Sequence, residues 1–391
     1  MGTAKQVCTK GVWDTSVPGI TFDADGASNY SKMFERYRDQ YPRGEKGKAD
    51  WDEFVSSIKK DGKRKDYDCI IGVSGGTDSS YLLHLAKAVY GLRPLAVNID
   101  NGWSSDISVK NIKKVTAALD IDLETHVIDY EEMKDILSSY MKARLPWIDF
   151  PTDQAIKTVL YRIANRENIK YILIGQDFRS EGTQPNEWTY GDAKQLKHIQ
   201  KTFGRQKLKT FPNISFLERL YLVYVKKMKL VFPFFFVEYN KQDAQQMLID
   251  TYGWEYYGGH HHENLFTKFA ISYWLYEKFG IDKRIITLSA QVMSGKVSRE
   301  EALSELEKIP YNPSTIESEK NFVIKKLGLD QQEFERIWKE DNKTYHDYPS
   351  SHDLILKIAR LVKPFIERIL PQLPSYFIQI EERDMGNNAK G

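Results

Sequence analysis

The sequence predicts an α/β protein in which a parallel β-sheet domain is followed by a mostly helical C-terminal region. Apolar runs typical of buried strands alternate with helical patterns in the first half of the chain, and helical periodicity dominates after Tyr190. Strands that alternate with helices form parallel sheets with right-handed crossovers. We therefore expect a Rossmann-like sheet with strands at residues 68–73, 94–99, 123–128 and 170–174.

Amphipathic spacing predicts the helices that connect these strands at residues 78–89, 108–119, 131–143 and 153–164. Residues 1–65 hold many turn signals, so we expect an irregular N-terminal arm that leads into a helix near residues 51–60. Further helices are predicted at 193–203, 215–228, 241–252, 265–279, 283–293, 299–308, 317–327, 331–340 and 352–369. This divides the chain into an arm (1–65), a sheet domain (66–205), a helical substrate or partner region (206–380) and a disordered polar tail (381–391).

The chain is organised around residues 68–80, D-C-I-I-G-V-S-G-G-T-D-S-S, which read as a strand, a glycine turn and the start of a helix. Gly75 and Gly76 let the backbone turn tightly against a phosphate, and the free N–H groups of the first helical turn point at it. The lysine of the G-x-x-x-x-G-K-[ST] loop is absent, so this is a different phosphate site. Hydroxyl donors, and a carboxylate for a phosphate-bound Mg²⁺, come from Ser74, Thr77, Ser79 and Asp78.

Composition sets broad limits on function. The chain is 41% hydrophobic and 28% charged with a net charge of +2, which is ordinary for a soluble enzyme and favours no nucleic-acid partner. Cys8 and Cys69 lie far apart, which argues against a disulfide framework and favours a reducing cytoplasm. The apolar stretch 220–237 is interrupted by lysines and Pro233, so we expect a protein core or an interaction groove there and no membrane span.

Residues 74–79 match the pyrophosphate loop S-G-G-x-D-S, and on this match the chain resembles the ATP pyrophosphatase superfamily of PP-loop, HUP-like domains. The resemblance implies cleavage of ATP between its α- and β-phosphates, with pyrophosphate held by the loop. It also implies that the end of the second strand lies against adenine and ribose, at Ile99, Asp100 and Asn101. Asp-Asn-Gly is equally typical of a plain tight turn. Gly175, after the fourth strand, is expected to meet the same nucleotide.

Later motifs are similar, in order and spacing, to the N-acetyl sugar amidotransferase family, which makes acetamidino sugars for bacterial O-antigens and for pseudaminic- or legionaminic-type acids. The similarity runs from about Val7 to Lys308. The segments that carry it are Asp14-Thr15-Ser16, residues 20–23 with Gly26, residues 100–103, residues 151–156, Trp188 with Tyr190, Gly253-Trp254, residues 257–259, His261, Glu263, residues 266–269, residues 279–284, Ser294-Gly295 and residues 299–303.

The chain departs from this family at two places. Family members usually carry paired C-x-x-C motifs that resemble a zinc ribbon, but the corresponding positions here are Cys8, Gly11, Ser28 and Ser31. We therefore expect no structural zinc at the arm. Where the family tends to have a histidine, this chain has Thr287, so no acid–base role is assigned to that position.

The resemblance implies cations near the α-phosphate, and we assign Lys268, Lys283 and Arg284 to that role, although such residues on helices are more often solvated. His261 and Glu263 are the candidates for acid–base chemistry or sugar binding. A metal site at His260–His262 with Glu263 is a less favoured alternative. Mg²⁺ is expected at Asp78 and Asp177, with Asp153 and Glu181 as further candidates for metal or substrate at the sheet edge.

These assignments predict an ATP-dependent amidotransferase that converts an acetamido group of a nucleotide-linked sugar to acetamidino through an O-adenylyl intermediate. Cys8 and Cys69 are not placed as glutaminase nucleophiles, so we expect ammonia from subunits that resemble the glutaminase and cyclase of histidine biosynthesis. The aromatic stretch 231–237 would dock them or pack in the core. The alternatives are a tRNA-modifying thiolase or lysidine-type enzyme, which would favour a basic surface and more cysteines, and a non-catalytic nucleotide-binding scaffold.

Overall fold

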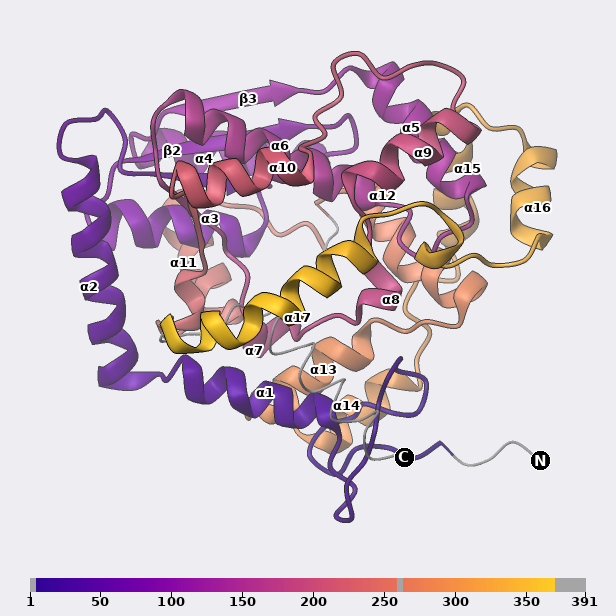
Figure 1. Ribbon diagram of the computed structural model, residues 1–391, viewed down its shortest axis with the longest axis horizontal. Helices are drawn as coiled ribbons and strands as arrows, with labels where there is room; N and C mark the ends of the chain where they lie inside the picture. The colour runs from indigo at the N-terminus through magenta and orange to yellow at the C-terminus, as the bar shows by residue number, and fades with distance from the viewer. Residues whose placement is uncertain (1–4, 259–262, 370–391) are drawn as a thin grey trace.

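The computed structural model describes residues 5–258 and 263–369 (Figure 1). Its centre is a five-stranded, wholly parallel sheet in the order β3-β2-β1-β4-β5. The strands are β1 (Cys69–Val73), β2 (Pro94–Asp100), β3 (Leu123–Val127), β4 (Tyr171–Leu173) and β5 (Lys229–Val231). The predicted parallel α/β fold is confirmed. The strand order reverses between β1 and β4, and ligands of such sheets bind beyond the carboxyl ends of the strands at that point.

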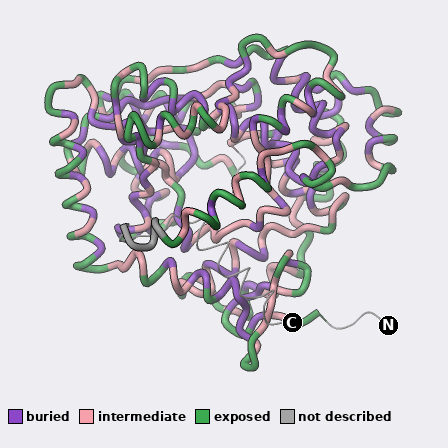
Figure 2. Tube along the Cα trace, viewed as in Figure 1, coloured by how far each residue is buried: buried purple, intermediate pink, exposed green. Residues whose placement is uncertain are grey.

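Both faces of the central strands are covered by helices, as the apolar run of β1 requires. Cys69, Ile71 and Val73 point to one face, where they join a core with α2 (Gly44–Gly62), α3 (Thr77–His84) and α4 (Asp106–Ala118). Ile70 points to the other face and packs in a core with α6 (Phe150–Arg166). A side chain on Gly72 would lie 3.2 Å from Leu160 of α6, so glycine allows that helix to pack closely. Figure 2 shows buried positions gathered along the sheet and the inward faces of the helices.

The edge strand β5 was not predicted, because a three-residue strand that begins with lysine gives almost no periodic signal. It pairs with β4, and Lys229 N donates to Lys170 O over 2.7 Å. The aromatic stretch after it is core, since Phe234 is fully buried and stacks on Tyr239 with ring centroids 4.1 Å apart. The boundary at residue 205 stays a prediction, although this strand of the sheet lies beyond it. No helix in the described ranges is long and apolar enough to span a bilayer.

The N-terminal arm is more ordered than expected, because it contains α1 (Asn29–Gln40) ahead of α2. The Ser28 hydroxyl caps α1 by accepting from Ser31 N, a signal that the sequence analysis missed. Three of the positions that resemble zinc ligands lie together: Ser28 N donates to Cys8 Sγ over 3.3 Å, and the Ser31 hydroxyl donates to Ser28 O over 2.6 Å. The Trp13 ring packs against Gly11. The expected absence of zinc stays a prediction.

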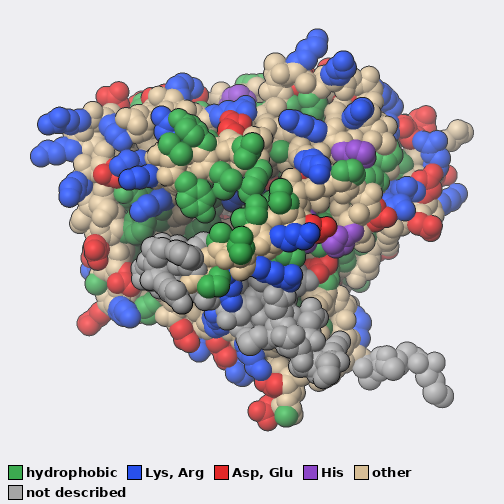
Figure 3. Space-filling model, viewed as in Figure 1, with side chains coloured by type: hydrophobic (Ala, Val, Ile, Leu, Met, Phe, Trp, Pro, Cys, Tyr) green, Lys and Arg blue, Asp and Glu red, His purple; other side chains and the backbone are tan. Residues whose placement is uncertain are grey.

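The remaining helices surround the sheet domain and bury a further core. Helices α5, α9, α12, α15 and α16 share one apolar cluster, while α13 packs against the arm. Hydrophobic side chains gather over α10 and α17 on the face in Figure 3. The exposed apolar side chains of these helices and of η2 include Leu217, Tyr224 and Leu361. The helical bounds are η1 (Leu85–Val89), α5 (Tyr130–Lys142), α7 (Phe178–Glu181), α8 (Asn186–Thr189), α9 (Ala193–Phe203), α10 (Phe216–Leu220), η2 (Tyr221–Val225), η3 (Pro233–Phe235), α11 (Lys241–Tyr252), α12 (Leu265–Phe269), η4 (Ala270–Lys278), α13 (Arg284–Met293), α14 (Arg299–Leu306), α15 (Ile316–Leu327), α16 (Gln331–Lys339), η5 (Tyr345–Asp347) and α17 (His352–Ile369).

Candidate active site at the phosphate loop

Residues 74–79, the phosphate loop, join the end of β1 to α3 at the switch in strand order. Gly75 has a φ of +78°, and a side chain there would lie 2.1 Å from the carbonyl oxygen of Ser108, so only glycine fits. Gly76 precedes the first helical residue, where the backbone N–H groups lack partners inside the helix. Ser79 Oγ accepts from Ser74 N over 3.2 Å and donates to Gly76 O over 3.3 Å, which closes the loop on itself.

Residues from a distant segment support this loop. Trp254 Nε1 donates to the carbonyl oxygen of Gly75 over 3.1 Å, and Asn111 Nδ2 reaches the same oxygen at 3.5 Å. The Tyr257 hydroxyl accepts from Thr77 N over 3.3 Å, so it lies at the N-terminus of α3. Burial, followed by the nearby charge of Glu263, raises the pKa of Tyr257 to about 12. The Gly253-Trp254 and Tyr257 motifs, which carried the resemblance without a role, therefore hold the loop.

Glu263 is brought to the phosphate loop although it lies far away in sequence. A side-chain carbon on Gly76 would be 3.6 Å from Glu263 Oε1. The backbone of Glu263 is fixed beside the end of β2, because its carbonyl oxygen accepts from Ser105 N over 2.9 Å. Its role in acid–base chemistry stays a prediction. His261 and the alternative metal ligands at 260–262 lie outside the described residues.

Asp78 is held by two residues that the sequence analysis did not identify. The Tyr239 hydroxyl donates to its Oδ1, and Lys241 Nζ donates to its Oδ2 over 2.9 Å. Burial would lower the pKa of Lys241, but the charge of Asp78 and the hydrogen bond to it outweigh burial and raise that pKa. These contacts join α3 to the start of α11, which is separated from it by some 160 positions, so no local pattern reveals them.

The charge of Asp78 acts on a second carboxyl group, that of Glu181. Burial raises the pKa of Glu181 to about 8, and the charge of Asp78 adds to that increase, while Lys241 opposes it. Mg²⁺ at nucleotides is commonly held by one or two carboxylates together with phosphate oxygens and water. Asp78 and Glu181 fit that description, and a metal between them would replace Lys241 as the counter-ion of Asp78.

Asp177 fits the metal role less well than Asp78. It is 1% exposed and caps α7, since its Oδ1 accepts from Arg179 N over 3.1 Å. Its Oδ2 accepts from the Ser180 hydroxyl over 2.8 Å and lies 3.5 Å from both Arg43 Nη2 and Lys296 Nζ. Asp78 also has a partner at each oxygen, but its side chain is 26% exposed, so it is more accessible to a metal ion than the buried Asp177. Mg²⁺ binding by either residue stays a prediction.

The nucleotide candidates at the strand ends have structural contacts of their own. Asp100 Oδ1 accepts from Gly102 N over 2.8 Å, which forms the tight turn. Asn101 is 3% exposed and accepts from Trp103 N over 3.1 Å. Gly175 lies against α3, where a side chain would be 3.0 Å from the backbone of Asp78. Ile99 is partly buried between two cores. Nucleotide contact by these residues stays a prediction.

Of the three candidate cations, two are engaged in ion pairs. Lys268 Nζ lies 2.6 Å from Glu319 Oε1, and Arg284 Nη2 lies 2.7 Å from Asp282 Oδ2. Arg284 also donates to the carbonyl oxygen of Glu305 over 3.0 Å, so it fastens α13 to the end of α14. Among the described residues, the contacts with Glu319 and Glu305 join helices to one another, and none of these ion pairs and hydrogen bonds is with the phosphate loop.

Lys283 has a different environment. Its Nζ lies 4.3 Å from the centroid of the Trp147 ring, and burial lowers its pKa against the raising charges of Asp153, Glu181 and Asp149. Trp147 Nε1 donates to Asp153 Oδ2 over 2.7 Å. Lys283 therefore belongs to a group of charges that extends from Glu181, beside the phosphate loop, to the start of α6.

Asp149, which the sequence analysis did not consider, completes this group. It is 1% exposed, its Oδ2 accepts from the Thr267 hydroxyl over 2.5 Å, and its Oδ1 has no hydrogen-bond partner within the described residues. Burial and, to a smaller extent, the charge of Asp153 one helical turn away together raise its pKa to about 7. The only available sequence signal was its place just before the residues 151–156 that carry the family resemblance.

The parallel strand order and the S-G-G-x-D-S loop after the central strand agree with the resemblance of this α/β protein to the PP-loop ATP pyrophosphatases. In the C-terminal part, residues 263–363 match the family model of the WbpG-like LPS biosynthesis protein C-terminal domain. This match confirms the resemblance to a surface-polysaccharide family in that part of the chain.

Among curated proteins, the chain is 25% identical over 293 residues to "Uncharacterized protein MJ1599" of Methanocaldococcus jannaschii, covering 74% of this chain and 87% of that protein. Among solved structures, NH3-dependent NAD synthetase from Campylobacter jejuni is 14% identical with a TM-score of 0.33, over 76% of this chain and 93% of that one. The U34-tRNA thiolase NcsA from Methanococcus maripaludis is 14% identical with a TM-score of 0.31, over 78% and 90%. At these TM-scores neither similarity bears on the ligands of this chain.

Proposed function

We propose that this protein is an ATP-dependent amidotransferase that converts an acetamido group of a nucleotide-linked sugar into an acetamidino group in surface-polysaccharide biosynthesis. The observation that supports this proposal best is the combination of the phosphate loop, with Asp78 and Glu181 beside it, and a C-terminal segment that matches an LPS biosynthesis family. We place the reaction in the cytoplasm, where ATP and nucleotide sugars occur together.

The chemistry has two steps. An amide carbon is a poor electrophile, so the acetamido oxygen first attacks the α-phosphorus of ATP and the bond to the β-phosphate oxygen breaks. Pyrophosphate leaves with its electron pair, and the product is an O-adenylyl imidate. Ammonia then adds to the imidate carbon, loses a proton, and expels AMP, which retains the former acetamido oxygen. The net change replaces oxygen by NH in the sugar and converts ATP to AMP and pyrophosphate.

The chain's own residues divide this work. The backbone N–H groups at the start of α3 would donate to the departing pyrophosphate, because they point out of a helix terminus; that of Thr77 would exchange the Tyr257 hydroxyl for a phosphate oxygen. Asp78 and Glu181 would hold Mg²⁺, which when bound neutralises phosphate charge. Lys283, whose pKa is lowered by burial against the opposing charge of Glu181, is the cation that we assign to the α-phosphate.

Proton transfer in the second step requires a base near the imidate carbon. Glu263 is assigned this role because its carboxylate lies against Gly76. Ammonia would come from a separate glutaminase with a cyclase-like partner, because Cys8 and Cys69 are both buried and cannot reach glutamine.

Pyrophosphate release tests this proposal. The purified protein is incubated with Mg²⁺, ATP and ammonium chloride, with either UDP-linked diacetamido sugars or bulk tRNA, and the sugar mass is followed. Sugar-dependent release with the mass change of oxygen replaced by NH, lost in Asp78→Ala, is the expected result. Release stimulated by tRNA alone would replace the sugar by a tRNA acceptor. ATP binding without release under every condition, with the glutaminase partner present, would favour a nucleotide-binding scaffold.

A further inference from the structure

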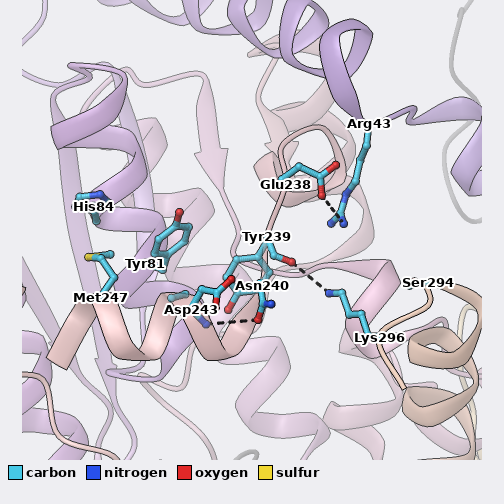
Figure 4. A pocket seen from close by; sticks show the side chains of 11 residues that line it. Arg43, Tyr81, His84, Glu238, Tyr239, Asn240, Asp243, Met247, Ser294 and Lys296 are labelled. Atoms are coloured by element: carbon cyan, nitrogen blue, oxygen red, sulfur yellow. Dashed lines mark hydrogen bonds and ion pairs between the residues drawn. The ribbon is translucent and has the colours of Figure 1, made fainter. Parts of the chain in front are cut away.

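A cavity of about 580 Å³ lies beside the phosphate loop, between α3 and α11 (Figure 4). Pockets of this size hold small organic ligands. Within the described chain, the lining of this cavity includes no residue of the phosphate loop or of the strand end at 99–101. A ligand in the cavity would therefore leave the proposed ATP site free, so the cavity is available to a second substrate.

The walls of the cavity follow from helical spacing. Tyr81 and His84 come three and six residues after Asp78, so they continue the face of α3 that begins at the phosphate loop. Asp243 and Met247, one turn apart on α11, form the opposite wall, as Figure 4 shows. Burial raises the pKa of Tyr81 and the charge of Asp243 adds to this, which agrees with the two side chains facing each other.

One end of the cavity is formed by Tyr239, which also touches the catalytic carboxylate. Its hydroxyl donates to Asp78, and its carbonyl oxygen accepts from Lys296 Nζ over 3.3 Å. Its ring is fixed by stacking on Phe234. A ligand in the cavity is thus separated from Asp78 by the side chain of Tyr239.

The lining combines two kinds of group that recognise a sugar ring. The rings of Tyr81 and His84 and the thioether of Met247 offer apolar surfaces to the C–H faces of a pyranose. Asp243 accepts hydrogen bonds from hydroxyl groups. At the far end, Arg43 brings a positive charge, with its Nη1 donating to Glu238 Oε2 over 3.2 Å and its Nη2 lying 3.5 Å from Asp177 Oδ2.

We propose that this cavity binds the sugar ring of the acceptor, with its polar substituents toward Arg43 and Lys296 and its acetamido group toward Asp78. This inference rests on the proposed function and adds to it the place of the second substrate. It assigns Tyr81, Asp243 and Met247 to sugar recognition, in addition to the candidates His261 and Glu263 that the sequence predicts for acid–base chemistry or sugar binding.

The test compares two tryptophan substitutions on α11. Met247→Trp fills the cavity, while Gln246→Trp places the same ring at the adjacent exposed position. Binding of a UDP-linked 2,3-diacetamido sugar without ATP is measured by calorimetry and saturation-transfer NMR, and its KM by pyrophosphate release. Binding of MgATP and thermal unfolding are measured on every variant. Asp243→Ala, at an exposed position, tests the same wall with less risk to folding.

Met247→Trp should weaken sugar binding and raise the sugar KM by at least about tenfold, with MgATP binding unchanged and Gln246→Trp within about twofold of the wild type. Asp243→Ala should show the same pattern with a smaller change. If Met247→Trp and Asp243→Ala bind the sugar and turn it over with the wild-type affinity and KM, the inference about the cavity is overturned, and the proposed amidotransferase function is unaffected. Loss of MgATP binding in Met247→Trp, or competition between MgATP and the sugar, would assign the cavity to the nucleotide. A wild-type protein that neither binds nor turns over any such sugar overturns both proposals.

Discussion

Replacing Asp149 by asparagine should remove a pH dependence of stability that the buried carboxyl group imposes. In the folded protein its pKa is raised to about 7 by burial and by Asp153, whereas an unfolded aspartate titrates near 3.8. The folded state therefore holds this proton more tightly, and the unfolded state loses protons first as the pH rises. Stability from this group is fully present below pH 3.8, falls as the pH rises toward 7, and is level above that.

The magnitude follows from about 1.4 kcal/mol per tenfold change in protonation, which gives a total loss of about 4 kcal/mol across the window. About 2.5 kcal/mol of this falls between pH 5 and pH 8. Asparagine keeps an oxygen that can accept from the Thr267 hydroxyl and carries no charge to bury. Asp149→Asn should therefore gain stability relative to the wild type at pH 8, and gain about 2.5 kcal/mol less at pH 5.

Urea unfolding followed by tryptophan fluorescence at the two pH values measures this difference. Asp135→Asn is the matched control, because the Asp135 carboxylate is buried but accepts from the backbone N–H groups of Arg205 and Gln206. That control should lose stability at both pH values, since its hydrogen bonds are broken. A difference between Asp149→Asn and the wild type that is the same at pH 5 and pH 8 would refute the reasoning.

Three further outcomes are expected. Gly75→Ala should unfold at a lower temperature in thermal denaturation and lose pyrophosphate release. The reason is that the added methyl group would lie 2.1 Å from the Ser108 carbonyl oxygen, on a backbone with a positive φ. Pyrophosphate release at the wild-type rate would contradict the close packing. Mg²⁺ binding in the presence of ATP at pH 7 should release a proton from Glu181, whose pKa is raised to about 8, and calorimetry in buffers of different ionisation enthalpy should find this release absent in Glu181→Gln. Lys268→Met should lower the free energy of unfolding by about 0.5–1 kcal/mol in urea, because the ion pair with Glu319 is lost. Its kcat should change less than tenfold, and a larger fall in kcat would support the predicted role of Lys268 at the α-phosphate.

Much of the sheet domain followed from local sequence alone. The continuous apolar run of β1 predicts a strand buried on both faces, and in the structure Cys69, Ile71 and Val73 pack against one layer of helices and Ile70 against the other. The loop at residues 74–79 was equally clear, because glycine and hydroxyl residues between a strand and a helix have few other uses. The edge strand β5 and helix α1 were missed since each has a weak or unusual local pattern.

The sequence by itself determined the parallel α/β fold, the phosphate loop and the carboxylate Asp78, because backbone geometry and helix termini depend on residues that are neighbours in the chain. Only the tertiary structure decided which groups surround that carboxylate. Tyr239 and Lys241 donate hydrogen bonds to Asp78 from some 160 positions away in the sequence. The charge of Lys283 acts on Asp149 from more than 130 positions away. These approaches arise when whole helices pack on the sheet, and the burial that accompanies packing, rather than any local motif, sets the charges of the site.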